Sequence, residues 1–197
     1  MVTVPLDDPR AAALLGRLAR ELRRFPGEFE KARVRVLNRT GAHMRTQATR
    51  ILAERYAAKV GELRRKFSVT RASSGAPFVL LRGEGQPLHL GLWPGGTAVV
   101  RQEGRRYLGA RVQILKGGGR KLVQGGFRAV SGRNQAGLIF KRKGQARYPL
   151  KTLYGPSLIG YLTNPRQSDL VENMARNYLE LEIQREAQYR LSKLGEL

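Results

Sequence analysis

The middle of the chain carries a concentration of cations with no carboxylate to balance them. Between Glu103 and Asp169 the 197-residue sequence contains no aspartate or glutamate. Lysine and arginine side chains in such a segment are suited to binding phosphates, because no acid close by in the sequence competes for them. Up to residue 151 the basic residues concerned are Arg105, Arg106, Arg111, Lys116, Arg120, Lys121, Arg128, Arg133, Lys141, Arg142, Lys143, Arg147 and Lys151.

The whole chain has a formal net charge of +22 at pH 7. Self-repulsion at this charge destabilises a compact protein, so the charge indicates an acidic partner, and nucleic acid is the usual one. The alternative is a solvated basic surface with no specific partner, although acidic residues serve solubility at least as well. Phosphate contact that does not depend on base sequence is therefore the favoured interpretation.

Two basic segments have the composition of turns between strands. The glycine triplet at 117–119 has cations on both sides and predicts a flexible hairpin tip, and the basic run ending at Gly144 predicts a turn after an apolar strand. Both turns could reach a phosphate backbone. The candidate nucleic-acid-binding residues are Lys116, Arg120, Lys121, Arg128, Lys141, Arg142 and Lys143.

Other chemistry finds little support in the sequence. The glycine triplet is not a nucleotide cradle, because Lys121 is followed by Leu122 where a phosphate-binding loop needs serine or threonine. The chain has no cysteine, and its central region offers no acid as a general base. Trp93 could stack on a base, but a core position is the favoured interpretation. We expect no enzymatic activity, no cofactor and no metal site.

Helices are predicted in the first third of the chain. Asp8 can cap an amphipathic helix over residues 9–25, a longer helix is expected from about 28 to 57, and a short helical turn over 60–67. No apolar run approaches membrane-spanning length. The apolar stripe of the longer helix comprises Phe29, Val36, Leu37, Met44, Ala48, Ile51 and Leu52.

A further helix is predicted at the end of the chain. Asn164 and Pro165 form a turn, and Ser168 is the expected helix cap. The mixed charge of this helix suits packing against protein. Its expected apolar stripe comprises Leu170, Val171, Met174, Tyr178, Leu181, Ala187, Leu191 and Leu194.

Short extended runs separated by glycine lie between these helices and are typical of an antiparallel sheet. The predicted fold class is α+β, with N-terminal helices, a central mainly antiparallel β-sheet with projecting basic hairpins, and a long C-terminal helix. We expect a single domain over 1–197, with a helical part at 1–67, a sheet part at 68–154 and the C-terminal helix at 155–197. The candidate strands are 68–70, 78–82, 88–93, 97–102, 107–116, 121–130, 138–141 and 148–154.

Several short motifs occur in an order that resembles the prophage minor tail protein Z family, over roughly residues 30–190. The most specific is the basic segment leading into Tyr154-Gly155-Pro156-Ser157 before the last helix. The others are Val36-Leu37-Asn38-Arg39-Thr40, Arg45-Thr46-Gln47, Leu63-Arg64-Arg65-Lys66-Phe67, Leu90-Gly91-Leu92-Trp93-Pro94, Phe140-Lys141-Arg142-Lys143-Gly144 and Leu150-Lys151-Thr152-Leu153.

The resemblance implies a structural protein of the virion that completes the tail at its head-proximal end, the neck. Such a protein forms a ring, expected to be hexameric, that helps head-tail joining and positions the genome end. The implied partners are further copies of the chain, the tail terminator, tail tube and neck proteins, and genomic DNA in the lumen, with no membrane. The implied location is the virion after assembly in the host cytoplasm. The expected assembly interface is Tyr154, Gly155, Pro156 and Ser157.

One alternative stays open at this point. A cytoplasmic protein that binds nucleic acid without sequence preference would use the same positive charge without forming a ring. Affinity for free DNA or RNA with no association with a particle would favour it.

Overall fold

The computed structural model describes residues 12–13, 16, 19–20, 26–94, 98–101, 107–128 and 137–195. The helix expected over 9–25, with Asp8 as its cap, falls largely outside these residues. The chain divides into two compact units. The first unit draws on 1–48, 67–83 and 162–197, and the second on 49–66 and 84–161.

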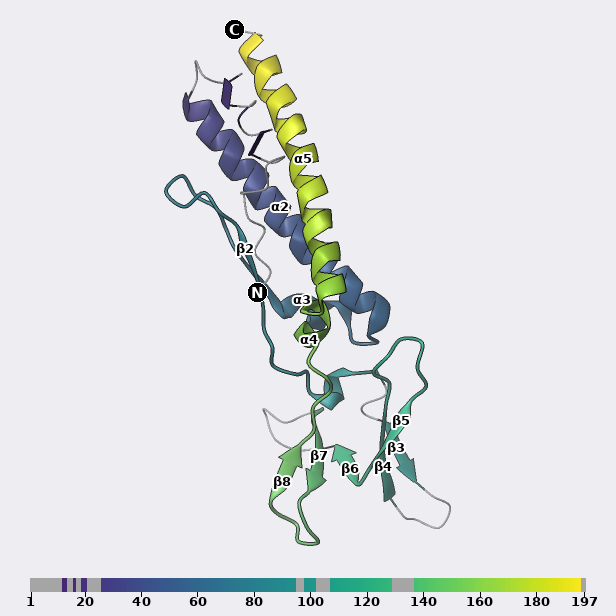
Figure 1. The fold of residues 1–197 in the computed structure, drawn as a ribbon. Helices are drawn as coiled ribbons and strands as arrows, with labels where there is room; N and C mark the ends of the chain where they lie inside the picture. Colours follow the sequence, from purple (N-terminus) through teal and green to yellow (C-terminus); the bar gives the residue numbers. More distant parts are fainter. Residues whose placement is uncertain are drawn as a thin grey trace. The chain divides into compact units, whose positions relative to one another are not determined.

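The described residues form an α+β fold, which confirms the predicted class (Figure 1). A helical segment comes first, small antiparallel sheets follow, and a long helix comes last. The elements are α2 (Pro26–Arg55), α3 (Val60–Arg65), β1 (Phe67–Thr70), β2 (Leu80–Gly83), the 3-10 helix η1 (Leu90–Leu92), β3 (Ala98–Arg101), β4 (Tyr107–Val112), β5 (Lys121–Gln124), β6 (Gly126–Arg128), β7 (Ile139–Arg142), β8 (Leu150–Thr152), α4 (Ile159–Leu162) and α5 (Pro165–Gly195).

The first unit is built on α2 and α5, which run side by side in opposite directions (Figure 1). Their apolar contact comes from positions spaced three or four residues apart, which lie on one face of each helix. The predicted stripe of α2 is confirmed, since all its members except Phe29 are buried. The cluster between the helices comprises Ala32, Val36, Leu37, Ala72, Leu179 and Ile183, with Phe29 and Ala187 packed against it.

Buried charges continue this contact along α5. Glu182, Glu186 and Arg190 are 3%, 2% and 6% exposed. Arg39 of α2 donates a hydrogen bond to Glu182 at 3.0 Å, and Arg35 of α2 donates one to Glu186 at 3.3 Å. Arg190 donates from Nε to Glu186 at 2.9 Å. The buried carboxylates are therefore paired, as burial of charge requires.

The environment of α5 also lowers the pKa values of Glu182 and His43. Burial would raise the pKa of Glu182, but hydrogen bonds from Arg185 and Arg39 hold it below its ordinary value. Burial lowers the pKa of His43, whose ring stacks on Tyr178 with the centroids 3.7 Å apart. Both shifts have the same sign, so this contact loses stability as the pH falls.

The hairpin of β1 and β2 packs on α2 at Gly41, where the helix has no side chain. A Cβ atom at Gly41 would lie 2.4 Å from Cγ2 of Val79, so only glycine allows the chains to approach this closely. Asn38 secures the segment that follows β1, since its side-chain amide donates to the carbonyl of Ala72 at 3.1 Å and accepts from the amide of Ala72 at 2.9 Å.

The start and the buried face of α5 differ from the prediction. The helix begins at Pro165, and the side chain of Asn164 accepts the amide of Arg166 at 3.2 Å, so Asn164 caps the helix and Ser168 does not. Leu170, Leu181 and Leu191, placed in the predicted stripe, are 42%, 41% and 42% exposed. The buried apolar residues are Val171, Ala175, Leu179 and Ile183.

The second unit contains two three-stranded antiparallel sheets, in the orders β3-β4-β5 and β6-β7-β8. With the β1-β2 hairpin, the described chain has three small sheets in place of the one predicted. The strand expected over 121–130 is divided because Gly125, at φ +67°, turns the chain between β5 and β6. The strand expected over 88–93 is wrong, since Leu90–Leu92 form a 3-10 turn.

Aromatic side chains form the core next to these sheets. The ring of Tyr56, which follows α2, meets Trp93 and Tyr161 edge to face at centroid distances of 6.0 Å each. The guanidinium of Arg55 lies over the ring of Tyr161 at 4.5 Å. Trp93 is 2% exposed, so its predicted core position is confirmed.

We predict that Glu186→Ala destabilises the protein by about 3 kcal/mol, because buried Arg190 would lose the partner of its Nε and keep only Glu28, and Arg35 would lose its hydrogen bond. Replacing both Glu186 and Arg190 by leucine should recover most of this stability, since it removes the poorly compensated charge. Urea unfolding followed by circular dichroism measures both effects. Glu54→Ala is the matched control, since its exposed pair with Arg50 is worth about 0.5 kcal/mol. A destabilisation below about 1 kcal/mol for Glu186→Ala would contradict the prediction.

Candidate nucleic-acid interface

Three of the basic side chains lie on one face of the sheet β6-β7-β8. Lys141 of β7 is directly opposite Lys151 of β8, and Arg128 of β6 is opposite Ile139, two residues before Lys141. Opposite residues in an antiparallel pair share a face, as do residues two apart in one strand. Arg128, Lys141 and Lys151 are all exposed, and we call this set the lysine face.

The lysine face is not neutralised within the described part of the chain. None of its three cations forms an ion pair there, and like charges directly opposite each other destabilise a strand pair unless an anion lies between them. The described carboxylates of the second unit are engaged elsewhere: Glu54 pairs with Arg50, Glu62 with Arg65 and Glu84 with Lys66. The face is therefore able to bind an external anion.

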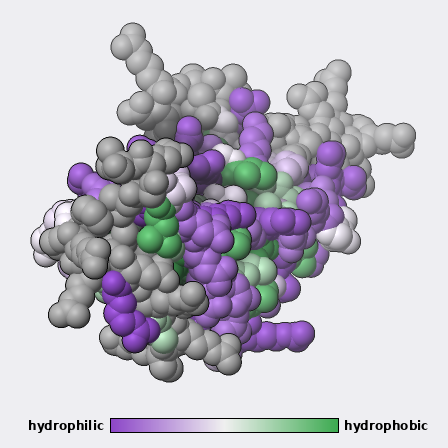
Figure 2. All heavy atoms as spheres, turned by 90° about the horizontal axis from the view of Figure 1, so that it is seen from above, coloured by the Kyte–Doolittle hydropathy of each residue, from purple (hydrophilic) through white to green (hydrophobic). Residues whose placement is uncertain are grey.

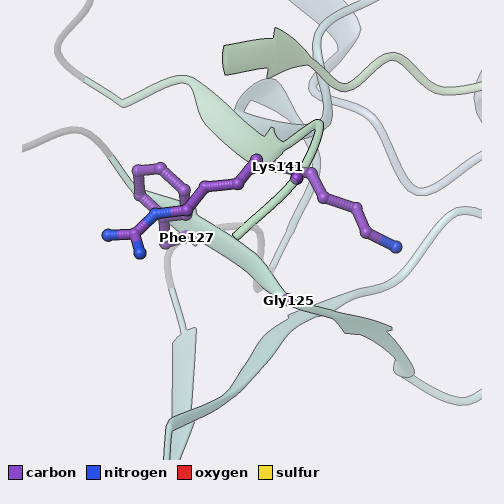
Figure 3. Close-up of a pocket in the computed structure, with 5 residues that line it drawn as sticks. Gly125, Phe127 and Lys141 are labelled. Carbon is purple, nitrogen blue, oxygen red and sulfur yellow. The ribbon is translucent and has the colours of Figure 1, made fainter. Parts of the chain in front are cut away.

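Arg142 points to the other side of the sheet. Its guanidinium lies over the ring of Phe127 at 5.9 Å, on the face opposite Lys141. An open hollow of about 550 Å³ adjoins these residues and is lined also by Gly125 and Gly144. Figure 3 shows Lys141 extending away from the ring of Phe127. The side chains of Lys141 and Arg142 thus lie on opposite faces of the sheet. Lys143 follows in the loop and is exposed, and its backbone amide donates a hydrogen bond to the carbonyl of Pro149 at 3.1 Å.

The glycine-rich hairpin tip is attached to the end of α2. The amide of Lys116 donates to the carbonyl of Arg55 at 2.9 Å, and the amide of Ala57 donates to Ile114 at 2.9 Å. The ammonium of Lys116 reaches the carbonyl of Ala53 at 3.4 Å. These bonds end β4 at Val112, before the expected end of the strand, and they restrain a tip that was expected to be flexible.

The cations of this tip remain exposed. Lys116, Arg120 and Lys121 all face solvent, and they lie at the connection between β4 and β5, in a different sheet from the lysine face. The structure therefore brings Arg128 and Lys141 together with Lys151 and leaves the tip as a separate basic site. Lys151 was not among the candidate residues, although the alternation of β8 and its pairing with β7 place it there.

Gly155 has an internal packing role in the expected assembly segment. Its amide donates to the carbonyl of Leu88 at 2.8 Å, and a Cβ atom at this position would lie 2.7 Å from Nε1 of Trp93. The indole therefore packs directly on the backbone of Gly155, and any side chain would displace it. This packing fixes how the chain leaves β8.

The neighbours of Gly155 offer their side chains to solvent. Tyr154 is 51% exposed, with its ring 4.4 Å from that of His89, and Pro156 is exposed. Ser157 donates a hydrogen bond to the carbonyl of Gly85 at 3.1 Å. The segment is thus anchored through Gly155 and Ser157, with Tyr154 and Pro156 available to a neighbour.

A comparison with protein-family models matches residues 17–194 to prophage minor tail protein Z. The chain belongs to the prophage minor tail protein Z family. Comparisons with curated proteins and with solved structures give no match. The family is one of phage tail proteins, and the match covers the second unit, most of the first unit and all of the candidate site residues.

Metal ligands and membrane-spanning helices can be sought only among the described residues of this minor tail protein. Among them, no group of three histidine or acidic side chains is arranged to hold a metal ion. None of the described helices is both long enough and apolar enough to cross a membrane. The lysine face and the basic hairpin tip carry the exposed positive charge that suits an anionic partner.

We predict that Gly155→Ala lowers the free energy of unfolding of the second unit by about 1–3 kcal/mol, because the new methyl group overlaps the indole of Trp93. Fluorescence reports this unit directly, since Trp93 is the one tryptophan of the chain. Gly144→Ala is the control, because its Cβ atom meets nothing within 4 Å. If the Gly155→Ala and Gly144→Ala variants unfold at the same denaturant concentration, the packing of Gly155 against Trp93 is dispensable.

Proposed function

We propose that this minor tail protein completes the tail at its head-proximal end and holds the genome end there by phosphate contacts. In this proposal copies of the chain form a ring, expected to be hexameric, and contact the tail terminator, tail tube and neck proteins. Its role is structural and involves no catalysis. Membership of the family supports the tail location, and the charge pattern of the second unit supports the contact with DNA.

The single observation that carries the DNA contact is the opposition of Lys141 and Lys151 on a sheet without acidic residues. Retaining two facing lysines costs stability unless an anion offsets the repulsion. Phosphate groups supply that anion in any base sequence, as a passage for a whole genome requires. The exposed tip with Lys116, Arg120 and Lys121 would add a second set of phosphate contacts.

The segment from Tyr154 to Ser157 is proposed to contact a neighbouring protein of the tail. Its backbone is held by the packing of Gly155 on Trp93, so the exposed Tyr154 and Pro156 are presented in a fixed position. A rigid segment binds with a smaller loss of conformational entropy than a mobile one.

We predict that replacing Arg128, Lys141 and Lys151 by glutamine weakens binding to random-sequence duplex DNA and reduces its dependence on salt. For every phosphate that the variant no longer binds, the slope of log affinity against log salt should fall by about 0.9, because fewer counterions are released on binding. Fluorescence anisotropy at several salt concentrations measures the slope.

The matched control replaces Lys31, Arg50 and Arg65 by glutamine. These cations lie on exposed helix surfaces and pair with Glu28, Glu54 and Glu62, so the net charge changes equally while the lysine face is intact. The control should retain most of the slope. Equal slopes for the two triple variants would mean that the lysine face is an ordinary solvated surface.

In particles, we predict that the Arg128, Lys141 and Lys151 variant is incorporated and allows heads and tails to join, while infectivity falls because the genome end is held poorly. The yield of joined particles, counted by electron microscopy, is compared with the number of infectious particles. If joining itself fails, these cations bind an acidic tail protein and not DNA. Absence of the unaltered chain from purified particles, together with affinity for free DNA, would favour the cytoplasmic nucleic-acid-binding alternative.

A further inference from the structure

The face of α5 that points away from α2 carries an uncharged stripe along most of the helix. Its positions are spaced four and three residues apart in alternation, which is the heptad pattern of a helix that packs against another helix. We call this stripe the α5 seam. It comprises Leu170, Met174, Asn177, Leu181, Gln184, Gln188 and Leu191.

The α5 seam is distinct from the contact with α2. The residues buried against α2 centre on Leu179, Ile183 and Glu186, on the opposite side of a helix with about 100° between successive residues. In the seam, Met174 is half-buried and the other members are exposed. Figure 2 shows that the coloured part of the surface is mainly hydrophilic, with hydrophobic residues exposed between the hydrophilic ones.

We propose that the α5 seam binds the α5 seam of a second copy, with the two helices parallel and in register. The inference deepens the self-association in the proposed function and rests on that part alone. A basic chain repels its own copies over most of its surface, but none of the seven seam residues is charged. Two such stripes can therefore come together without placing like charges in the contact.

The charged residues on the two sides of the seam favour a second copy as the partner and a parallel direction of the two helices. Glu180 precedes Leu181 on one side of the seam, and Arg185 follows Gln184 on the other. In a parallel in-register pair, residues at these two heptad positions, five apart in sequence, lie next to each other across the contact. Glu180 of each copy then faces Arg185 of the next.

Both side chains can make this pair. Glu180 forms no ion pair with a described residue, and the side chain of Arg185 is 58% exposed while it bonds to Glu182 at 2.9 Å. A guanidinium has five N–H donors, so Arg185 can hold both carboxylates. An antiparallel pair would instead place Glu180 beside Asn173, Glu180 or Ala187 of the second copy, none of which is basic.

The geometry allows a closed ring as well as a dimer. In a parallel arrangement each helix presents Glu180 to one neighbour and Arg185 to the other, so the same contact can repeat around an axis. Asn177, Gln184 and Gln188 keep the seam partly polar, which gives a weak contact that high local concentration strengthens.

Cross-linking of the purified full chain tests the proposal. The sequence has no cysteine, so Leu170→Cys and Leu191→Cys each introduce one thiol at an end of the seam. In a parallel contact each variant should form a disulfide with its own kind under mild oxidation. Ala42→Cys, at an exposed position of α2, is the control and should remain mostly monomeric.

Adding Leu181→Glu to the Leu170→Cys chain should reduce the cross-linked fraction at least about tenfold, because it places like charges in the middle of the contact. Adding Ala42→Glu should leave that fraction unchanged, and circular dichroism verifies that both chains fold. The proposal is overturned if Leu170→Cys forms no more disulfide than Ala42→Cys. It is also overturned if disulfides form only when the Leu170→Cys and Leu191→Cys chains are mixed, since this indicates an antiparallel contact. Either result leaves the DNA and particle experiments unaffected.

Discussion

The rest of the structure depends on where the few carboxylates are placed. The chain has 15 acidic and 37 basic side chains, so its carboxylates can neutralise fewer than half of its positive charges. The described ion pairs involve α2, α3 and α5 and the loop residue Glu84, and the deepest of them join Glu182 and Glu186 to arginines between two helices. None of the described ion pairs involves a residue of the strands β3 to β8. The placement of the carboxylates thus stabilises the pair of helices and also leaves the cations of the sheets without described acidic partners.

The same pairing explains which parts of the fold could be predicted from the sequence. In α2 the buried face is apolar, so helical spacing identified Val36, Leu37 and Met44 correctly. In α5 the buried face includes Glu182 and Glu186, so the apolar spacing pointed to Leu181 and others on the exposed side. Hydrophobic periodicity cannot detect a face whose charges are neutralised by residues more than a hundred positions away.

The errors among the strands have a different cause. Periodicity gave the approximate position of most strands, but it could not show that Gly125 turns the chain from one sheet into the next. The run from Leu88 to Trp93 is apolar enough for a strand. Its backbone instead makes a short helical turn, and this places Trp93 against Gly155, which is far along the sequence. Such long-range packing leaves no local signal.

The candidate site shows the same limit on a smaller scale. Lys141, Arg142 and Lys143 form one basic motif in the sequence, yet adjacent residues of a strand point to opposite faces. Lys141 faces Lys151 across the strand pair, while Arg142 lies over Phe127 on the other side. Charge composition therefore points only to a region of the chain, whereas strand pairing decides which of its cations share one face. Lys141 and Lys151 come from separate strands and share a face, whereas Lys141 and Arg142 are neighbours in the sequence and do not.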